Sequence, residues 1–355
     1  MPTSFALSDV FLAEVDQRLR AFVDRQRPLI SGPELNPLLE AAEDFLSGGK
    51  RLRPAFCYWG WRGAGGGDDP AIFTAAASLE LLQASALIHD DVMDASDLRR
   101  GRPAAHRRFQ ALHEESGWQG SAEQFGEGAA VLLGSLLLVW SSEMWRTSGL
   151  PAASLAAAER VHDQMRTELM CGQYLDLLEQ AHGGGTFESA LRVALHKSGK
   201  YSVEQPLRLG LLLAARAEEP WIDRLCVDYG QKVGIAFQLR DDVLGVFGDP
   251  VETGKPAGDD LREGKRTMLI ARALSEATPR QAADVRLLLG DPKLEEDGVR
   301  RLREIIEETG ALAASEEMIK RYLDDALACL ESAPITAEAR EALRELAIAA
   351  TSRRS

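Results

Sequence analysis

Cysteine is scarce, with only four residues among 355, all widely separated. Cys57, Cys171, Cys226 and Cys329 form no CxxC pair and have no histidine at ligand spacing. The sequence therefore argues against a disulfide framework and a zinc site, and predicts buried free thiols. Aromatic residues make up only 6%, while alanine and leucine are abundant, which favours helices over sheets.

Positive charge is also in short supply, because 41 Lys and Arg stand against 55 Asp and Glu, for a net charge of −14. Nucleic-acid surfaces need a basic footprint, so we expect no nucleic-acid partner. The N-terminus lacks the basic and apolar regions of a signal peptide. The longest apolar run, 129–140, is interrupted by Gly134 and Ser135 and is too short to span a bilayer. These features predict a soluble cytoplasmic protein without a transmembrane segment.

Apolar residues recur at spacings of three and four through most of the chain, and the breaks between these stretches are rich in Gly and Pro. This pattern predicts an all-α fold. Because no linker or internal repeat is evident, one domain over 1–355 is the economical interpretation. The predicted helices cover 8–25, 35–48, 71–95, 123–147, 152–181, 186–214, 220–246, 266–276, 278–289, 295–307, 315–332 and 337–350.

Two aspartate-rich segments lie about 150 residues apart, each after a largely apolar run. The first contains Asp90 and Asp94, one helical turn apart on one face, and the second contains Asp241 and Asp242. Carboxylates at the C-terminal end of an apolar helix, where the dipole disfavours anions, need a compensating cation. Mg²⁺ meets this need, because it binds carboxylates while keeping waters and substrate phosphates. The pattern therefore predicts a cavity that holds a diphosphate.

Basic segments accompany these acidic clusters. These basic segments distinguish the two acidic clusters from the other Asp-Asp pairs of the chain, at 68–69, 259–260 and 324–325. Glycine together with lysine or arginine suits phosphate binding, and such segments occur at 48–54, 97–103, 196–200 and 248–265. A basic loop follows each acidic cluster, and the last one is long, charged and rich in glycine, as is typical of a closing lid.

With these motifs the chain resembles the trans-isoprenyl diphosphate synthases, also called polyprenyl synthetases. The matching motifs are GGKRLRP at 48–54, LIHDDVMD at 87–94, RRGRPAAH at 99–106, GQYLD at 172–176, KS at 197–198, GIAFQLRDD at 234–242 and GKPAGDDLREGKRT at 254–267. The resemblance implies the isoprenoid synthase fold, an all-α helical bundle around a central active-site cavity, with further helices in 268–355. It also implies a homodimer, and a Mg²⁺-dependent, head-to-tail condensation of isopentenyl diphosphate with an allylic diphosphate (dimethylallyl, geranyl or farnesyl).

The resemblance also assigns roles to residues. It implies that Asp90 and Asp94 bind two Mg²⁺ and that Asp241, with Asp242, holds a third. The implied ligands of the allylic diphosphate are Arg99, Lys197 and Lys255, with Lys265 further along the same charged loop. Those of isopentenyl diphosphate are Gly49, Lys50, Arg53, Gln83 and Arg100. Ser198 and Gln238 are implied to stabilise the developing cation. The catalytic set is Asp90, Asp94, Arg99, Lys197, Gln238, Asp241 and Lys255.

One position departs from the family pattern. The second acidic motif commonly ends in a third aspartate, and here that position is Gly245. Asp249, one turn further on, is one candidate substitute; a weaker third metal site and one completed by water are the others. We expect activity to be kept, because Lys255 and Gln238 are present.

Product length in this family depends on the helical turns before the first aspartates. Ser85 and Ala86 are small, and Leu82 on the next turn is a candidate stop. One isoprene unit is about as long as one helical turn, about 5 Å, so small residues here predict a product longer than farnesyl. Geranylgeranyl diphosphate (C20) is the expected product, with C25–C35 chains or farnesyl diphosphate as alternatives.

Three other functions are less consistent with the sequence. A class I terpene cyclase would carry an Asn/Ser/Glu metal motif where this chain has Asp241 and Asp242, and it would have little use for the 48–54 segment. A di-iron bundle would need Glu-x-x-His pairs, which the sequence lacks. A non-catalytic partner subunit of another synthase should have lost its acidic motifs, and only Gly245 favours it.

Overall fold

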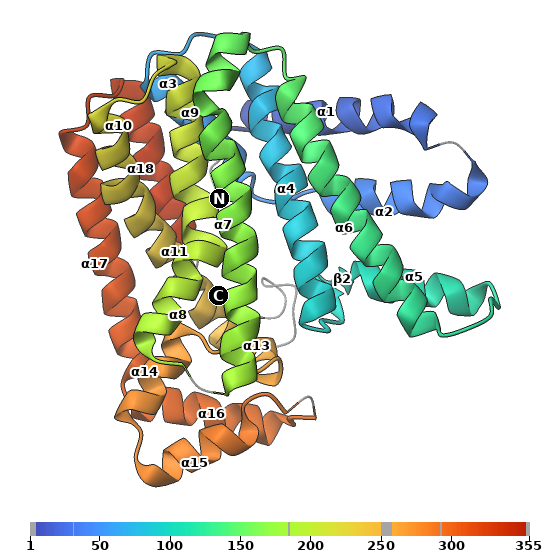
Figure 1. The fold of residues 1–355 in the computed structure, drawn as a ribbon. Coiled ribbons are helices and arrows are strands. Elements are labelled where there is room, and N and C mark those ends of the chain that lie inside the picture. The colour runs from blue at the N-terminus through green and yellow to red at the C-terminus, as the bar shows by residue number, and fades with distance from the viewer. Residues whose placement is uncertain (1–4, 31, 184, 250–257, 292, 353–355) are drawn as a thin grey trace. The chain divides into compact units, whose positions relative to one another are not determined.

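The structure, a computed structural model, describes residues 5–30, 32–183, 185–249, 258–291 and 293–352. Regular structure in these ranges is helical apart from one short two-stranded hairpin, which confirms the all-α prediction (Figure 1). By its internal contacts the chain separates into two compact units, each described by itself. Unit 1 comprises 1–159, 209–218 and 335–346, and unit 2 comprises 160–208, 219–334 and 347–355. The single domain over 1–355 stays a prediction.

Unit 1 is built around α4, which packs against α1, α3 and α6. Its elements are η1 (Phe5–Leu7), α1 (Asp9–Gln26), η2 (Arg27–Leu29), η3 (Pro33–Leu35), α2 (Asn36–Leu46), α3 (Leu52–Gly63), α4 (Ala71–Met93), β1 (Leu98–Arg99), β2 (Arg102–Pro103), α5 (Ala105–Glu115) and α6 (Ala122–Arg146). It also takes in the first residues of α7 (Ala152–His182) and parts of α9 (Gln205–Ala215) and α18 (Ala337–Thr351).

Unit 2 is built around α11, which packs against α17, α14 and two π-helical segments. Besides the remainder of α7, α9 and α18, its elements are α8 (Phe187–Ala194), η4 (Leu195–Glu204), α10 (Pro220–Leu225), η5 (Cys226–Gln231), α11 (Lys232–Phe247), α13 (Asp259–Arg262), α14 (Met268–Glu276), α15 (Pro279–Leu288), α16 (Glu296–Glu308) and α17 (Ala311–Glu331). Arg240 ties α11 to α17 through two 2.6 Å hydrogen bonds to Glu316.

The predicted helices are confirmed, with boundaries that follow from capping. Among the described residues, six helices begin directly after a Ser or Thr whose side-chain oxygen accepts a backbone N–H of the first turn: Ser8, Ser121, Thr186, Thr267, Thr278 and Thr336. Three α-helices of the described residues fall outside the predicted ranges, namely α3, α5 and the four-residue α13. In α3 most residues are buried, so it shows no clear apolar stripe.

Among the described residues, two helices, α4 and α6, are long and apolar enough by composition to cross a membrane. In α4, 67% of the apolar window is buried within the protein, as in the core helix of a soluble protein, whereas in α6 the share is 39%. The absence of a transmembrane segment stays a prediction. The lower burial of α6 leaves apolar side chains on its surface, and these bear on assembly below.

The four cysteines are free thiols. Burial raises the pKa of both Cys57 and Cys226 to about 12, so these two are inert apolar side chains. The expectation that all four are buried is wrong for Cys171, which is exposed, and Cys329 is half-buried.

Candidate active site

The first acidic cluster lies at the C-terminal end of α4 in unit 1. Asp90 is 9% exposed and Asp91 is fully buried, while Asp94 is the C-cap residue of the helix. The chain reverses direction immediately afterwards at Ala95, which has a left-handed φ of 53°. Three carboxylates at the negative end of a helix dipole favour a bound cation.

A β-hairpin brings Arg99 to this cluster. Strands β1 and β2 are joined by Arg100 and Gly101, both with positive φ (53° and 73°), as a two-residue type I′ turn requires. The Arg99 guanidinium pairs with the Asp91 carboxylate, with Nε 2.9 Å from Oδ1, and its Nη2 lies 3.8 Å from Asp90 Oδ2. Arg99 therefore lies beside the acidic cluster, as predicted. Asp91, which the sequence analysis left without a role, is the buried anchor that orients it.

The glycine turn at 48–51 holds a second group of cations in unit 1. Gly48 and Gly49 have φ values of 71° and 101°, and Arg51 is left-handed at 51°. A Cβ at Gly49 would lie 3.4 Å from Arg100 Nη2, an ordinary van der Waals contact, so the Arg100 guanidinium lies directly beside this turn, and it is the positive φ that favours glycine. Removal of water lowers the pKa of Arg100, and the neighbouring Arg51, Arg99 and Arg53 lower it further against the opposing effect of Glu80. The structure thus brings together Gly49, Arg53 and Arg100, as predicted for an anion site.

Arg51 differs from the basic residues on either side of it. Its side chain is buried and donates to Glu80 (2.7 Å), Asp16 (2.8 Å) and the Leu46 carbonyl (2.5 Å). Its charge is thereby neutralised inside the protein, which makes it an anchor for the turn. Lys50 is exposed and Arg53 half-buried, so these two are better placed to meet a ligand. Gln83 on α4 is half-buried, and within the described residues its Oε1 is buried without a hydrogen-bond partner.

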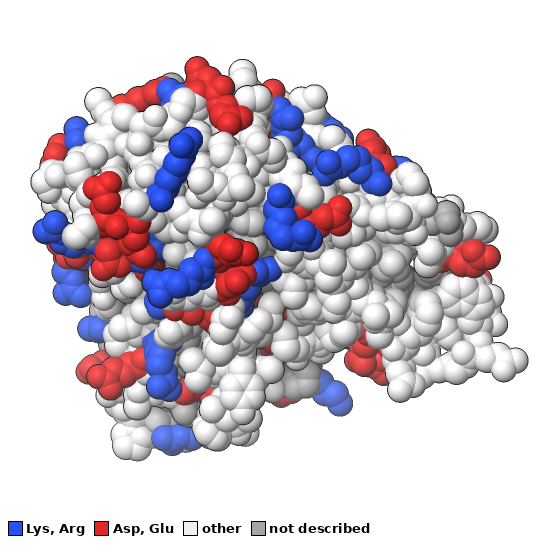
Figure 2. Space-filling view, turned by 45° about the horizontal axis from the view of Figure 1, so that its top comes forward, with Lys and Arg blue, Asp and Glu red and all other residues white. Residues whose placement is uncertain are grey.

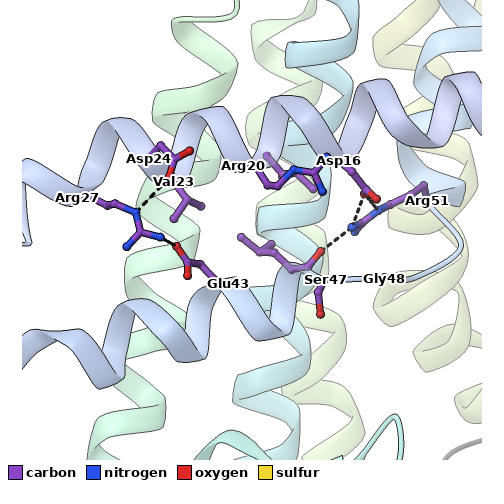
Figure 3. A pocket seen from close by; sticks show the side chains of 11 residues that line it. Asp16, Arg20, Val23, Asp24, Arg27, Glu43, Ser47, Gly48 and Arg51 are labelled. Carbon is purple, nitrogen blue, oxygen red and sulfur yellow. Dashed lines mark hydrogen bonds and ion pairs between the residues drawn. The ribbon is translucent and has the colours of Figure 1, made fainter.

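A pocket of about 330 Å³ adjoins this turn between α1 and α2 (Figure 3). Three acidic and three arginine side chains line it, and Figure 3 shows Arg27 directed at Asp24 and Glu43, and Arg51 at Asp16. Neither Lys50 nor Arg53 lines it. Since its charges are balanced and largely paired, we do not assign it to the diphosphate.

The second acidic cluster lies near the C-terminal end of α11 in unit 2. Asp241 is half-buried, whereas Asp242 is 4% exposed and accepts a 2.7 Å hydrogen bond from Gln238 Nε2. Burial raises the pKa of Asp242 to about 7 against the effect of the Gln238 hydrogen bond, and the charges of Asp260 and Asp241 add to the rise. Asp249, the candidate substitute for the missing aspartate, is exposed beyond Gly248, after the helix has ended.

Lys197 and Ser198 lie on the π-helical segment η4. π-Helical turns are rare and are often found at functional sites. Here close backbone approaches hold the segment: a Cβ at Gly172 would lie 2.6 Å from the His196 carbonyl carbon, and one at Gly234 would lie 2.6 Å from the Gly199 oxygen. Lys197 Nζ donates to Asp176 Oδ2 at 2.6 Å, so Asp176 of the GQYLD motif positions this lysine.

Two predicted lysines belong to the segment after α11. Lys265 lies in unit 2, with its Nζ 2.8 Å from Glu263 Oε2 and 3.6 Å from Asp260 Oδ1. Lys255 lies outside the described residues. Asp260, from an Asp-Asp pair to which the sequence analysis gave little weight, is thus close to both Lys265 and the second acidic cluster.

The donor set suits magnesium. The acidic clusters offer only hard carboxylate oxygens, with no histidine or thiolate among them. The carboxylate of Asp260 occupies the space beside Gly245 in the second cluster. In the described part of the chain no three His, Cys, Asp or Glu side chains form a ready-made cage. Mg²⁺ ordinarily completes its shell with waters and substrate phosphates, so a partial protein shell fits it.

Comparison with known proteins identifies the family. The sequence profile described as polyprenyl synthetase matches residues 36–306. The chain belongs to the polyprenyl synthetase family. This confirms the resemblance, and similar proteins of the family are prenyl diphosphate synthases, so the chain is a prenyltransferase of a Mg²⁺-dependent family.

Similar members differ in their products. A geranylgeranyl pyrophosphate synthase from Corynebacterium glutamicum, solved with isoprenyl diphosphate and magnesium, shares 40% identity with a TM-score of 0.94, covering 98% of this chain and 99% of that one. The geranylfarnesyl diphosphate synthase of Aeropyrum pernix is 32% identical over 94% of this chain and 96% of its own length. Component 2 of the heptaprenyl diphosphate synthase of Geobacillus stearothermophilus is 33% identical over 89% of each chain. The isoprenoid synthase fold is therefore confirmed, while membership alone leaves the product open.

Proposed function

We propose that this prenyltransferase condenses isopentenyl diphosphate with an allylic diphosphate (dimethylallyl, geranyl or farnesyl) to give geranylgeranyl diphosphate. The observation that carries the proposal is the pairing of an acidic cluster with an oriented arginine. Asp90 and Asp94 can hold metal at the end of α4, and Asp91 holds Arg99 beside them. This arrangement suits a leaving diphosphate whose charge must be neutralised.

In this proposal Asp90 and Asp94 hold two Mg²⁺, and Asp241 and Asp242 hold a third. When bound, the metal ions supply Lewis-acid stabilisation of the diphosphate as the C–O bond ionises. We propose that the basic side chains complete this neutralisation on the allylic substrate, namely Arg99, Lys197, Lys255 and Lys265. Because Asp176 accepts from Lys197 and Asp91 from Arg99, both cations are oriented before substrate binds.

Isopentenyl diphosphate is assigned to the cationic group around the 48–51 turn. Lys50, Arg53 and Arg100 supply charge there, Gly49 supplies backbone, and Gln83 supplies an amide. We further propose that Ser198 and Gln238 stabilise the developing cation. The isopentenyl double bond attacks that cation, and the departing diphosphate is the proposed acceptor of the proton that is then lost.

The proposal of a C20 product depends on the residues of α4 that precede Asp90. At about 100° per residue, Ala86 lies roughly 40° from Asp90 around the helix and Leu82 roughly 80°. Ala86 is half-buried, whereas Leu82 and Ser85 are fully buried. A small residue near the first aspartate leaves room for a chain longer than farnesyl, which supports the C20 assignment. The Corynebacterium synthase is a relative of the same product class.

Ala86→Phe is expected to shorten the product to C15 or less, because an aromatic ring near Asp90 would block chain growth. Product lengths would be read after phosphatase treatment, with wild type giving C20. Ala157→Phe, at a half-buried alanine of α7, is the control for a general effect of adding a ring. An unchanged C20 product from Ala86→Phe would refute the assigned growth direction, and C25 or longer chains from wild type would refute the C20 product.

We also propose that the enzyme is a cytoplasmic homodimer whose subunits meet through α6. Val131, Leu132 and Val139 of this helix are 44%, 67% and 63% exposed. Figure 2 shows a broad area with few charged side chains on the right of the view. An apolar helix face of this kind is typical of an interface.

The double change Leu132→Glu and Val139→Glu is expected to give monomers, because burying two carboxylates in an apolar interface is unfavourable. Sedimentation velocity measures the result. Leu287→Glu, at a 77% exposed leucine of α15, is the matched control and should leave the dimer intact. A dimer that survives the double change would exclude α6 as the interface, and a wild-type monomer would exclude the homodimer.

A further inference from the structure

The second acidic cluster has two aspartates on α11, Asp241 and Asp242, and lacks a third at position 245 of the same helix. Gly245 lies four residues after Asp241, one turn further along the same face of α11. Glycine inside a helix costs about 1 kcal/mol relative to alanine, and its presence here therefore calls for a local reason. The surroundings of Gly245 supply one.

The space beside Gly245 is filled by another aspartate. A Cβ built on Gly245 would lie 2.5 Å from the carboxyl carbon of Asp260 and 3.2 Å from its Oδ1, and it would overlap Oδ2. Real Cβ atoms essentially never approach a heavy atom within 3.0 Å. Any side chain at 245 must therefore displace the Asp260 carboxylate, which now occupies the volume that the side chain of an aspartate at 245 would take.

The backbone of the α13 region holds Asp260 in this place. The helix starts after Gly258, which is left-handed (φ 74°) and whose Cβ would lie 2.7 Å from Val299. The Asp260 carbonyl accepts a 3.0 Å hydrogen bond from the Lys265 N–H, closing the turn. Lys265 Nζ lies 3.6 Å from Asp260 Oδ1, so this lysine is a cationic neighbour of the carboxylate, and it is itself 2.8 Å from Glu263 Oε2.

We propose that Asp260 supplies the third carboxylate of the second acidic cluster, and that Gly245 is the residue that makes room for it. The inference rests on the proposed function, in which Asp241 and Asp242 hold Mg²⁺. The third carboxylate thus comes from the α13 segment instead of α11, and it would add negative charge beside an ion held by Asp241 and Asp242. Restoring aspartate at 245 would therefore put two carboxylates into one space and weaken the site.

The test is binding of Mn²⁺, as a paramagnetic stand-in for Mg²⁺, with inorganic pyrophosphate as the probe. Electron paramagnetic resonance counts the bound ions and gives their affinities without any turnover. Asp260→Asn is expected to weaken the loosest ion about 10- to 100-fold, the usual effect of losing an outer-shell partner. Gly245→Ala, which displaces the carboxylate, should weaken it in the same direction.

Asp259→Asn is the matched control. Asp259 shares the first turn of α13 and its helix-end charge with Asp260, so a general effect of negative charge near the helix would appear in both variants. The swap Gly245→Asp with Asp260→Gly should recover most of the affinity that Gly245→Asp alone loses.

Equal affinities in wild type, Asp260→Asn and Asp259→Asn would overturn the inference while leaving the proposed function intact. A gain in affinity from Gly245→Asp alone would overturn it as well. A wild-type protein that binds no Mn²⁺ with pyrophosphate would overturn the proposed function together with the inference. Thermal unfolding of each metal-free variant confirms that the compared proteins are folded.

Discussion

Asp90→Asn is expected to lower the rate of prenyl transfer by about 10³-fold, since losing one well-placed stabilising group costs about 10²–10³ and a metal ligand also fixes the ion. Asp90 is 9% exposed at the end of α4, and Arg99 Nη2 lies 3.8 Å away. Asparagine preserves the shape and removes the charge. The effect should appear in kcat at saturating Mg²⁺ and substrate.

Asp324→Asn is the control for this prediction. Asp324 is an exposed aspartate on α17 and belongs to one of the Asp-Asp pairs without an assigned role, so its replacement should leave the rate within about 2-fold, as surface changes usually do. An Asp90→Asn enzyme that kept most of its kcat, in folded protein, would contradict the metal-binding role of Asp90.

Asp242→Asn is expected to abolish most activity and yet stabilise the metal-free protein at neutral and higher pH. The pKa of Asp242 is raised from 3.8 to about 7 by burial, so the folded state keeps a proton that the unfolded state releases. Stability is therefore highest below about pH 4 and falls as the pH rises towards 7. Asparagine has no carboxyl group to ionise, so the variant does not lose stability in this way as the pH rises. Its side-chain oxygen can still accept from Gln238 Nε2, which lies 2.7 Å from Asp242 Oδ1 in the wild type.

The measurement is urea unfolding in EDTA between pH 4 and 8. The difference between variant and wild type should grow with pH, to about 1–4 kcal/mol above pH 7, because one pKa unit corresponds to about 1.4 kcal/mol. Mg²⁺ with pyrophosphate should then stabilise wild type more than the variant, because binding ions requires the charged carboxylate. A difference that does not change with pH would show that Asp242 is already ionised in the metal-free fold.

The sequence predicted the fold and the position of Arg99 beside Asp90 because both depend on local patterns. Apolar periodicity predicted the long helices, and Ser or Thr caps explain why their boundaries agree with the structure. Asp90 and Arg99 are close in sequence, and Arg99 lies on a tight hairpin just after the helix that carries Asp90. Their closeness in space can therefore be predicted from the motif. Helix α3 was missed because a helix buried on most sides has no polar face.

Contacts between residues far apart in the chain could not be predicted from local sequence patterns. Nothing in the run at 48–54 distinguishes Arg51, which pairs with Asp16 and Glu80, from Lys50, which is exposed. Likewise, the Asp259-Asp260 pair resembles a solvated helix start until the fold places Asp260 against Gly245. In both cases the decisive partner comes from another element, and its position depends on tertiary packing.

We expect this chain to catalyse elongation by itself. The most direct test is incubation of the purified protein with labelled isopentenyl diphosphate and each allylic primer, with Mg²⁺ or with EDTA, followed by analysis of the product chain. We expect a C20 product with Mg²⁺ and no product with EDTA. Folded protein that elongates no primer in the presence of Mg²⁺ would contradict this expectation and favour a non-catalytic subunit that acts with a second chain.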